Sequence, residues 1–455
     1  MSDALAIAEL ALEHVRSGDE LEAVVHREFS GLARFAGSEV HQPTLIDNCT
    51  LQISVVRAGA LGTTSTNRVE DDGIAAAVAR AGEAAASATP DPEFPGFAEP
   101  APVAAVDGYD GPTAGLGAQD LAGLASAAIS AAAPLQAYGY ATSGLCELAV
   151  ASTTGVRVSQ RFTDATVRAL AAGEGRSGFA EQTSWAVGGV DADATGRDAT
   201  ARAELTSGAG EIDPGVYRAV LEPYAFGELL QWFAWDAFSG LALIEERSAL
   251  TGKIGSPWVD PKVSIVDDAL DPRGLPKAFD FEGTPKQRVV LVEEGVARGV
   301  VWDRISAARA GDGHRSTGHA LPLAERSYGP VPRALEVGPG EAESVEALAE
   351  LVGDGVYVTR FHYLGIVDPR EGILTGMTKD GTFRIRDGRI AEPLVNLRFT
   401  VAVPELLADV PGLTRTQKLV SQSEYYDERY PQAALVPAIA TGRFAVTGTG
   451  AAPGL

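Results

Sequence analysis

Cysteine is scarce in this chain. Only Cys49 and Cys146 occur among 455 residues, and neither belongs to a C-x-x-C pair. Two isolated cysteines cannot build a disulfide framework or a four-cysteine zinc site. Such usage is typical of a reducing compartment, so the sequence predicts a cytoplasmic protein.

Basic residues and long apolar runs are also few. The chain has 37 Lys plus Arg against 61 Asp plus Glu, a formal net charge of −24. This excess of acid repels phosphate backbones and anionic lipid surfaces. No stretch approaches the roughly 20 apolar residues that a membrane-spanning helix needs. The N-terminal segment lacks the basic region of a signal peptide and suits an amphipathic helix. We therefore expect neither nucleic acid nor a membrane as a partner.

The length favours two domains, because 455 residues exceed the size of one ordinary core. The segment SGAGEIDP, residues 207–214, breaks the periodic pattern and sets the predicted boundary. We expect an N-terminal α/β layered domain over residues 1–212 and a C-terminal domain over residues 213–455. A Pro- and Gly-rich excursion, residues 89–117, should hold little regular structure inside the first domain.

Alternating apolar and polar residues predict strands in both halves. In the first half, residues 51–59 and a hairpin turning at 153–155 alternate, and helices are expected over 71–88 and 120–133. The second half has mostly patterns that predict strands, with tight turns expected at Glu294–Gly295 and Asp387–Gly388. The predicted fold class is α+β, with a large, mostly antiparallel curved sheet in the second domain.

An aromatic segment, VLEPYAFGELLQWFAWDAFSG at 220–240, predicts a helix over 223–240. Large apolar residues occur on nearly all its sides: Phe226, Leu229, Leu230, Trp232, Phe233, Trp235 and Phe238. A helix of this kind is expected to be buried in a core. The alternative places some of its aromatic residues at a subunit interface.

Two groups of polar residues are candidates for a site. His314 and His319, with Asp312 beside them, are a close histidine pair in a glycine-containing segment. Imidazoles and carboxylates bind metal ions, but no third and fourth ligand is evident, and a structural or solvated role is the alternative. In a predicted strand, alternation places Arg360 and His362 on one face and Tyr363 on the other. These three residues are candidates for a substrate cleft, and a solvent-facing sheet surface is the alternative.

Common nucleotide-binding and hydrolase motifs do not occur. The sequence has no Walker-type phosphate loop and no G-x-S-x-G nucleophile elbow, and its nearest dinucleotide motif lacks the third glycine. Nucleotide binding and serine hydrolysis of the α/β type are left without support.

The order of several segments resembles the TldD/TldE (PmbA) family over nearly the whole chain. The matching segments are RFAGSEVHQ at 34–42, STNR at 65–68, the hairpin 142–167, VLEP at 220–223, SIVDDALDPRGLPKAFDFEGTPKQRVVLVEEG at 264–295, RSTGHA at 315–320 and VDPREG at 367–372. The family implies a two-domain architecture of the TldD/PmbA type. It also implies a heterodimeric zinc metalloprotease in which the TldD-type subunit has HExxxH on the helix after VLEP and a cysteine near the C-terminus.

Aligned from VLEP, that motif falls on residues 231–236 of this chain. Gln231 and Asp236 stand where the two histidines would be, and Trp232 replaces the glutamate base. Glutamine is a poor zinc ligand and an indole cannot take a proton from water. Residues 418–437 contain no cysteine. The resemblance is therefore to the TldE (PmbA) type of subunit, with a degenerate site and no cofactor of its own.

The expected function follows from this resemblance. The chain would be the non-catalytic subunit that pairs with a TldD-like, zinc-bearing partner. The pair would cleave unfolded or small peptides, or mature a peptide precursor of a natural product. Two alternatives stay open: an independent hydrolase, with a metal ion at His314 and His319 or with other acid-base residues, and a homodimeric binding protein without enzymatic activity.

Overall fold

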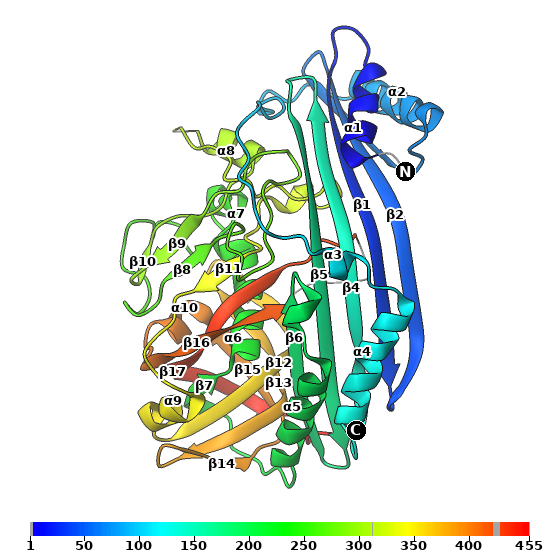
Figure 1. Ribbon diagram of the computed structural model, residues 1–455. Coiled ribbons are helices and arrows are strands. Elements are labelled where there is room, and N and C mark those ends of the chain that lie inside the picture. Colours follow the sequence, from blue (N-terminus) through cyan, green and yellow to red (C-terminus); the bar gives the residue numbers. More distant parts are fainter. Residues whose placement is uncertain (1–2, 312, 422–427, 455) are drawn as a thin grey trace.

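A computed structural model describes residues 3–311, 313–421 and 428–454 of the chain. It contains two β-sheets flanked by helices, so the predicted α+β class is confirmed (Figure 1). None of the helices in these ranges has the length and apolarity needed to span a bilayer.

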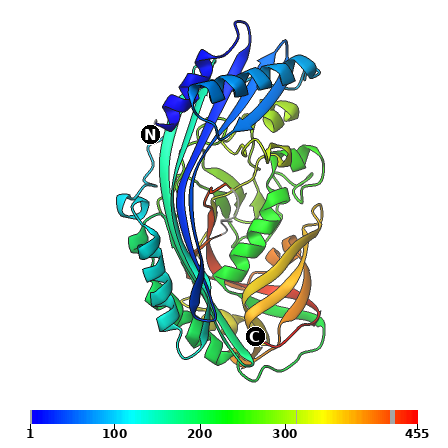
Figure 2. The ribbon, with the colours of Figure 1, turned by 90° about the vertical axis from the view of Figure 1, so that its right-hand side faces the viewer.

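The first sheet consists of six antiparallel strands in the order β3-β2-β1-β4-β5-β6. The strands are β1 Glu20–Ala36, β2 Glu39–Arg57, β3 Ala60–Thr66, β4 Gln136–Ser152, β5 Arg157–Gly173 and β6 Arg176–Ser184. Four of them are 17 or 19 residues long. Figure 2 shows that these long strands curve around the second half of the chain.

Helices cover one face of this sheet. They are α1 Ala4–Glu13, α2 Asp71–Ser87, α4 Ala118–Ala131 and α5 Ala192–Leu205, with the short α3 Gly111–Ala114 and the 3-10 turn η1 Val187–Gly189 between them. Strand alternation explains the layer: Leu21 and Val25 of β1 are buried with α1 and α2, while Ala33 and Phe35 are buried with α4. Glu22, Val24 and His26, which alternate with Leu21 and Val25, point to the opposite face.

The second sheet has eleven strands and is mostly antiparallel, as predicted. They are β7 Gly215–Leu221, β8 Ile265–Asp267, β9 Val289–Glu293, β10 Val296–Ala297, β11 Leu335–Val337, β12 Gly355–Asp368, β13 Ile373–Arg386, β14 Arg389–Pro393, β15 Leu397–Ala402, β16 Gly412–Ser421 and β17 Ala433–Thr449. Two pairs of strands are parallel: β7 with β12, and β11 with β17. Because β17 pairs with both β15 and β7, the strands β7, β12, β13, β15 and β17 close on themselves.

The other helices belong to this second half. They are α6 Pro223–Ala237, α7 Gly240–Ile244, α8 Arg304–Ala310, α9 Val345–Val352 and α10 Val403–Leu407, with the 3-10 turn η2 Arg326–Tyr328. Figure 2 shows α6 between the curved first sheet and the strands of the second. The large core around α6 also includes Phe179 of β6, so the two sheets share packing at this place.

Local turn chemistry predicts the hairpins well. Glu294 and Gly295 both have positive φ between β9 and β10, and Asp387 and Gly388 do so between β13 and β14. The prediction missed β1 and began β2 twelve residues too late. The excursion 89–117 contains only α3 as a helix, and residues 206–214 separate α5 from β7. The division into two domains at that segment stays a prediction.

The face of the first sheet that lacks helices buries charged side chains against the second half. The Arg429 guanidinium donates hydrogen bonds to both carboxylate oxygens of Asp164 on β5, at 2.8 and 2.7 Å, and to Thr142 on β4. The Arg429 backbone N–H donates to Glu28 on β1. Arg429 and Asp164 are only 2% and 1% exposed. This pair therefore joins the end of the chain to three strands of the first sheet in a nearly dry environment.

We predict that Arg429→Met strongly destabilises the protein, because it leaves the Asp164 carboxylate buried without its partner. The expected loss is about 3–5 kcal/mol in the free energy of unfolding, measured as a lower denaturant midpoint. The double variant Arg429→Met/Asp164→Leu should recover much of this loss, since it removes both charges.

Arg386→Met is the matched control. Arg386 forms an ion pair with Glu392 in the exposed β13–β14 hairpin, where solvent already screens both charges. The denaturant midpoint of Arg386→Met should differ little from that of the natural chain. Equal losses for the two arginine variants would contradict a special role of the buried pair.

Candidate functional site

Helix α6 is held at its first turn by a buried carboxylate. Strand β7 ends at Leu221, Glu222 is the N-cap residue, and Pro223 occupies the first turn, where its missing N–H costs no hydrogen bond. The Arg202 guanidinium on α5 donates to both oxygens of Glu222, at 2.9 and 2.7 Å, and the Tyr357 hydroxyl of β12 also bonds to this carboxylate. These contacts fix the direction in which α6 leaves the sheet.

A groove of about 600 Å³ opens beside this turn. Its lining includes Arg202, Glu222, Thr416, Gln417 and Lys418. Burial and the neighbouring Arg202 lower the pKa of Lys418, whose ammonium lies 4.4 Å from the centre of the Tyr224 ring. Apolar residues such as Val345 and Leu419 also line the groove, which lies at the start of α6 and not at residues 231–236.

The three residues aligned with the zinc motif lie in the second half of α6. Trp232 is 42% exposed, which corrects the expectation that this helix is buried on nearly all sides. Phe233 and Leu230 do pack in the core, but Gln231, Trp235 and Asp236 are only half-buried. The helix has one open face because nothing in the described chain covers it, and its aromatic pattern alone could not reveal that.

Asp236 has a cation partner of its own. The Arg247 guanidinium, on the segment after α7, bonds to the Asp236 carboxylate and also to Glu245 at 2.7 Å. This ion pair engages the carboxylate that the alignment places at the second histidine position. The donor set of Gln231, Trp232 and Asp236 does not fit zinc. Within the described ranges, no three His, Cys, Asp or Glu side chains are grouped so as to hold a metal ion.

Glu228 is a site residue that the motif search missed. It lies one turn before Gln231 and Trp232 on the half-buried side of α6. Burial raises its pKa to about 7, and the positive charges of Arg360 on β12 and Arg168 on β5 limit the rise. In the sequence, this residue could be noticed only as a glutamate three positions before residues 231–236. Its burial depends on strands that are remote in the sequence, so the sequence does not show it.

The three predicted cleft residues differ in their contacts and exposure. Arg360 forms an ion pair with Asp380 of β13 at 3.0 Å and lies near Glu228. Burial, followed by the nearby Arg360, lowers the pKa of His362. Tyr363 has a positive φ at an irregularity of β12 and is 79% exposed, with its ring centre 4.0 Å from that of His362. The irregularity ends the strict alternation that put Tyr363 on the opposite face.

The histidine pair is separated by its contacts. The His319 ring is buried, with Nε2 2.8 Å from Asp267 and Nδ1 2.9 Å from Thr317. Both ring nitrogens are engaged, which leaves none for a metal ion in this arrangement. The His314 ring lies against Trp302 at 4.6 Å between centres. Asp312, the third member of the predicted group, lies outside the described residues.

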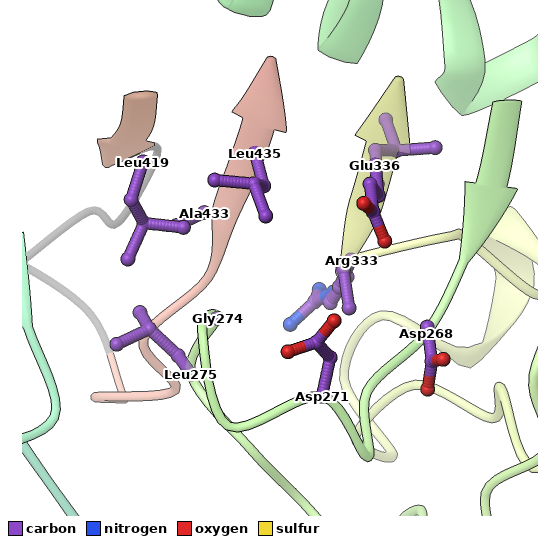
Figure 3. Close-up of a pocket in the computed structure, with 11 residues that line it drawn as sticks. Asp268, Asp271, Gly274, Leu275, Arg333, Glu336, Leu419, Ala433 and Leu435 are labelled. Carbon is purple, nitrogen blue, oxygen red and sulfur yellow. The ribbon is translucent and has the colours of Figure 1, made fainter. Parts of the chain in front are cut away.

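A small pocket lies at the RGLP segment of the long family-like stretch (Figure 3). Asp271 and Leu275 enter it from one loop, while Glu336 and Leu435 come from β11 and β17. Its volume of about 20 Å³ has room for about one water molecule. It cannot hold a peptide.

Two sequence models of known families match the chain. The one described as the PmbA/TldA metallopeptidase C-terminal domain matches residues 214–448, and the one described as PmbA/TldA metallopeptidase domain 1 matches residues 21–85. The first covers α6 and the second sheet up to residue 448.

Individual relatives agree with these matches. A metalloprotease of Methanothermobacter thermautotrophicus is 29% identical over 204 residues, which cover 44% of this chain and 43% of that protein. The chain spans less than half the length of the curated relatives it matches. The structure of TldE from Thermococcus kodakarensis is similar with a TM-score of 0.84 and 19% identity, over 97% of this chain and 99% of that one. A candidate modulator of a DNA gyrase from Thermotoga maritima gives 0.83 and 20%, over 97% and 98%.

The raised pKa of Glu228 predicts a pH effect on stability. The unfolded carboxyl ionises near its ordinary pKa of 4.5 and the folded one near about 7. Between these values the folded chain binds more protons, so this group makes stability fall as the pH rises through the window. Glu228→Gln should lack that fall and gain stability relative to the natural chain, on the order of 2 kcal/mol at pH 8 after allowance for solvent screening.

Unfolding of the two proteins at pH 5 and pH 8 measures this difference. Glu392→Gln is the control, because Arg386 and backbone hydrogen bonding lower the pKa of this exposed carboxyl. That variant should show no gain at high pH. Parallel pH profiles for Glu228→Gln and the natural chain would show that Glu228 is not desolvated.

Proposed function

The chain belongs to the PmbA/TldD metallopeptidase family, and on this premise we propose that it is the non-catalytic, TldE-type subunit of a heterodimeric zinc peptidase. The partner is a TldD-like chain that holds the zinc ion. The substrates are unfolded or small peptides, or a peptide precursor of a natural product.

The composition of α6 carries this proposal. A catalytic zinc site needs three protein ligands with an open position, and a base for the bound water. Residues 231–236 supply neither, and Asp236 is neutralised by Arg247. A chain that keeps the family's helix and core but not its metal ligands is suited to shaping and stabilising a site on another chain.

The surroundings of α6 suit a surface that a second subunit covers. Trp232 is exposed, and Trp235 packs edge-on against the exposed Tyr328, with 5.9 Å between ring centres. Aromatic side chains at the centre of an interface contribute large amounts of binding free energy. We assign these three aromatic residues, Trp232 and Trp235 of α6 and Tyr328 of η2, to the contact with the TldD-like partner.

Strand β12 suits contact with an extended peptide. It pairs with β7 only over Gly355–Val358, so from Thr359 to Asp368 its one partner among the described strands is β13. The other edge of this part of β12 has backbone groups that an added strand can bond to. Arg360 and His362 lie there, which agrees with their assignment to the substrate cleft.

Co-expression with a TldD-like chain tests the proposal. We expect a stable one-to-one complex with peptidase activity that EDTA abolishes, and no zinc on this chain when it is purified alone. Metal analysis and size-exclusion chromatography with light scattering provide the readouts.

Other results would favour the alternatives. Stoichiometric zinc on the isolated chain, lost in His314→Ala, would indicate an independent hydrolase. A homodimer that neither binds the TldD-like chain nor supports EDTA-sensitive activity would indicate a binding protein.

Trp232→Ala should weaken the complex without unfolding the chain. Loss of a central interface tryptophan costs about 2 kcal/mol or more, which corresponds to a dissociation constant roughly thirtyfold higher. The unfolding midpoint of the isolated chain should change little because the side chain is 42% exposed. Leu205→Ala, at the exposed end of α5, is the control and should leave the affinity unchanged. Equal affinities for both variants would remove Trp232 from the interface.

A further inference from the structure

The charges around Glu228 do not balance. Arg168 donates to Glu181 at 2.6 Å, and Arg360 pairs with Asp380 at 3.0 Å. Each guanidinium therefore has its own carboxylate. Glu228 is a third carboxylate beside two paired arginines, and no hydrogen bond or ion pair within the described ranges reaches it. One negative charge is left over when Glu228 ionises.

Each arginine has two partners other than Glu228, although the Arg360 Nε and the Asp380 carboxylate form an ion pair without a hydrogen bond. Arg360 lies 4.2 Å and Arg168 5.6 Å from the centre of the Phe179 ring, in addition to their ion pairs. Glu181 is fixed further by the Ser421 backbone N–H, and Asp380 by the Ser177 hydroxyl at 2.7 Å. Their positive charge acts on Glu228 at a distance without making a bond to it.

Among the residues that the structure describes, no other charged group that acts on Glu228 supplies the missing cation. The charged groups that act on Glu228 are Arg360 from β12, Arg168 from β5 and Glu181 from β6. His362, two residues along β12 from Arg360, has its pKa lowered by burial and by Arg360, so it is neutral at pH 7. A buried carboxylate without a partner is unfavourable, and a cation that arrives with a ligand removes that cost.

Glu228 is placed where a ligand can reach it. It is half-buried, and its neighbours one turn later on α6 are the half-buried Gln231 and the exposed Trp232. Arg360, whose charge acts on Glu228, lies at the start of the edge of β12 with which no described strand pairs. A peptide bound to that edge would run past Arg360.

From this arrangement we infer that Glu228 is a binding residue for an ammonium group of the peptide substrate, held between α6 and the Arg360 end of the β12 edge. The inference rests on the proposed function, because it places the peptide in the cleft of the two-subunit complex. The ammonium group is either the free α-amine or a lysine side chain. Glu228 takes no part in bond cleavage and acts by positioning the substrate.

The inference is tested by steady-state kinetics of the complex with three peptides that share one sequence of uncharged residues. The first has a free α-amine, the second an acetylated N-terminus, and the third an acetylated N-terminus and one lysine. Glu228→Gln should raise KM about tenfold for the first or the third peptide, and the one affected identifies the source of the ammonium group. KM for the second peptide and kcat for all three should stay within about twofold, since the substitution removes only a binding contact.

The pH dependence gives a second readout. Glu228 binds an ammonium group only when ionised, so KM of the natural complex for the lysine peptide should fall as the pH rises from 6 to 8. For the peptide with a free α-amine the fall should end near pH 7, because that amine loses its proton at about pH 8. The ratio of KM values between Glu228→Gln and the natural complex should grow over the same range. Glu392→Gln, on the exposed β14, is the control and should follow the natural complex throughout.

Three results would overturn the inference. KM could be unchanged by Glu228→Gln for all three peptides, or it could rise equally for all three. Glu228→Gln could also weaken assembly with the TldD-like chain while KM of the assembled complex stays the same, which would assign Glu228 to a cation of the partner. Failure of the natural chains to form an active complex would instead contradict the proposed function.

Discussion

The burial of charge between the two sheets is the constraint on which the rest of this structure depends. A carboxylate or guanidinium in a nearly dry environment is tolerated only with a partner in good geometry. Asp164 and Arg429 satisfy each other with two hydrogen bonds, and the same arginine reaches Thr142 and the Glu28 carboxylate. Such pairs fix how the second half of the chain sits in the curve of the first sheet, and a small displacement would leave several charges without partners.

That placement explains the properties of α6. Arg202 of the first half bonds to Glu222, the N-cap residue of the helix, and the Tyr224 hydroxyl bonds to the backbone of Glu181 on β6. One side of α6 is thereby fixed to the first sheet and another lies in the large core. The remaining side, with Trp232, is open. Charge pairing also extends along α6: Asp236 has Arg247, whereas Glu228 is flanked by arginines that already have partners. The helix thus has one carboxylate with a cation of its own and one without.

Much of the fold was predictable because its signals are local. The hairpins at Glu294–Gly295 and Asp387–Gly388 need only residues that accept positive φ between alternating strands. The start of α6 at Pro223 follows from one proline after a strand. Strand β1 was missed because its pattern mixes apolar and charged residues on the face that meets the second half. Glu22, His26 and Glu28 are 2%, 2% and 4% exposed, and their burial depends on partners hundreds of residues away.

The sequence by itself determined the class of fold, the position of α6 and the absence of zinc ligands from residues 231–236, because residue type and order decide each of these. Only the tertiary structure decided which side of α6 is open, that Asp236 is bound by Arg247, that both nitrogens of His319 are engaged, and that Glu228 is desolvated beside paired arginines. Each of these properties is a matter of distance between groups remote in the chain. Exposure and charge balance depend on such distances, and a linear pattern does not contain them.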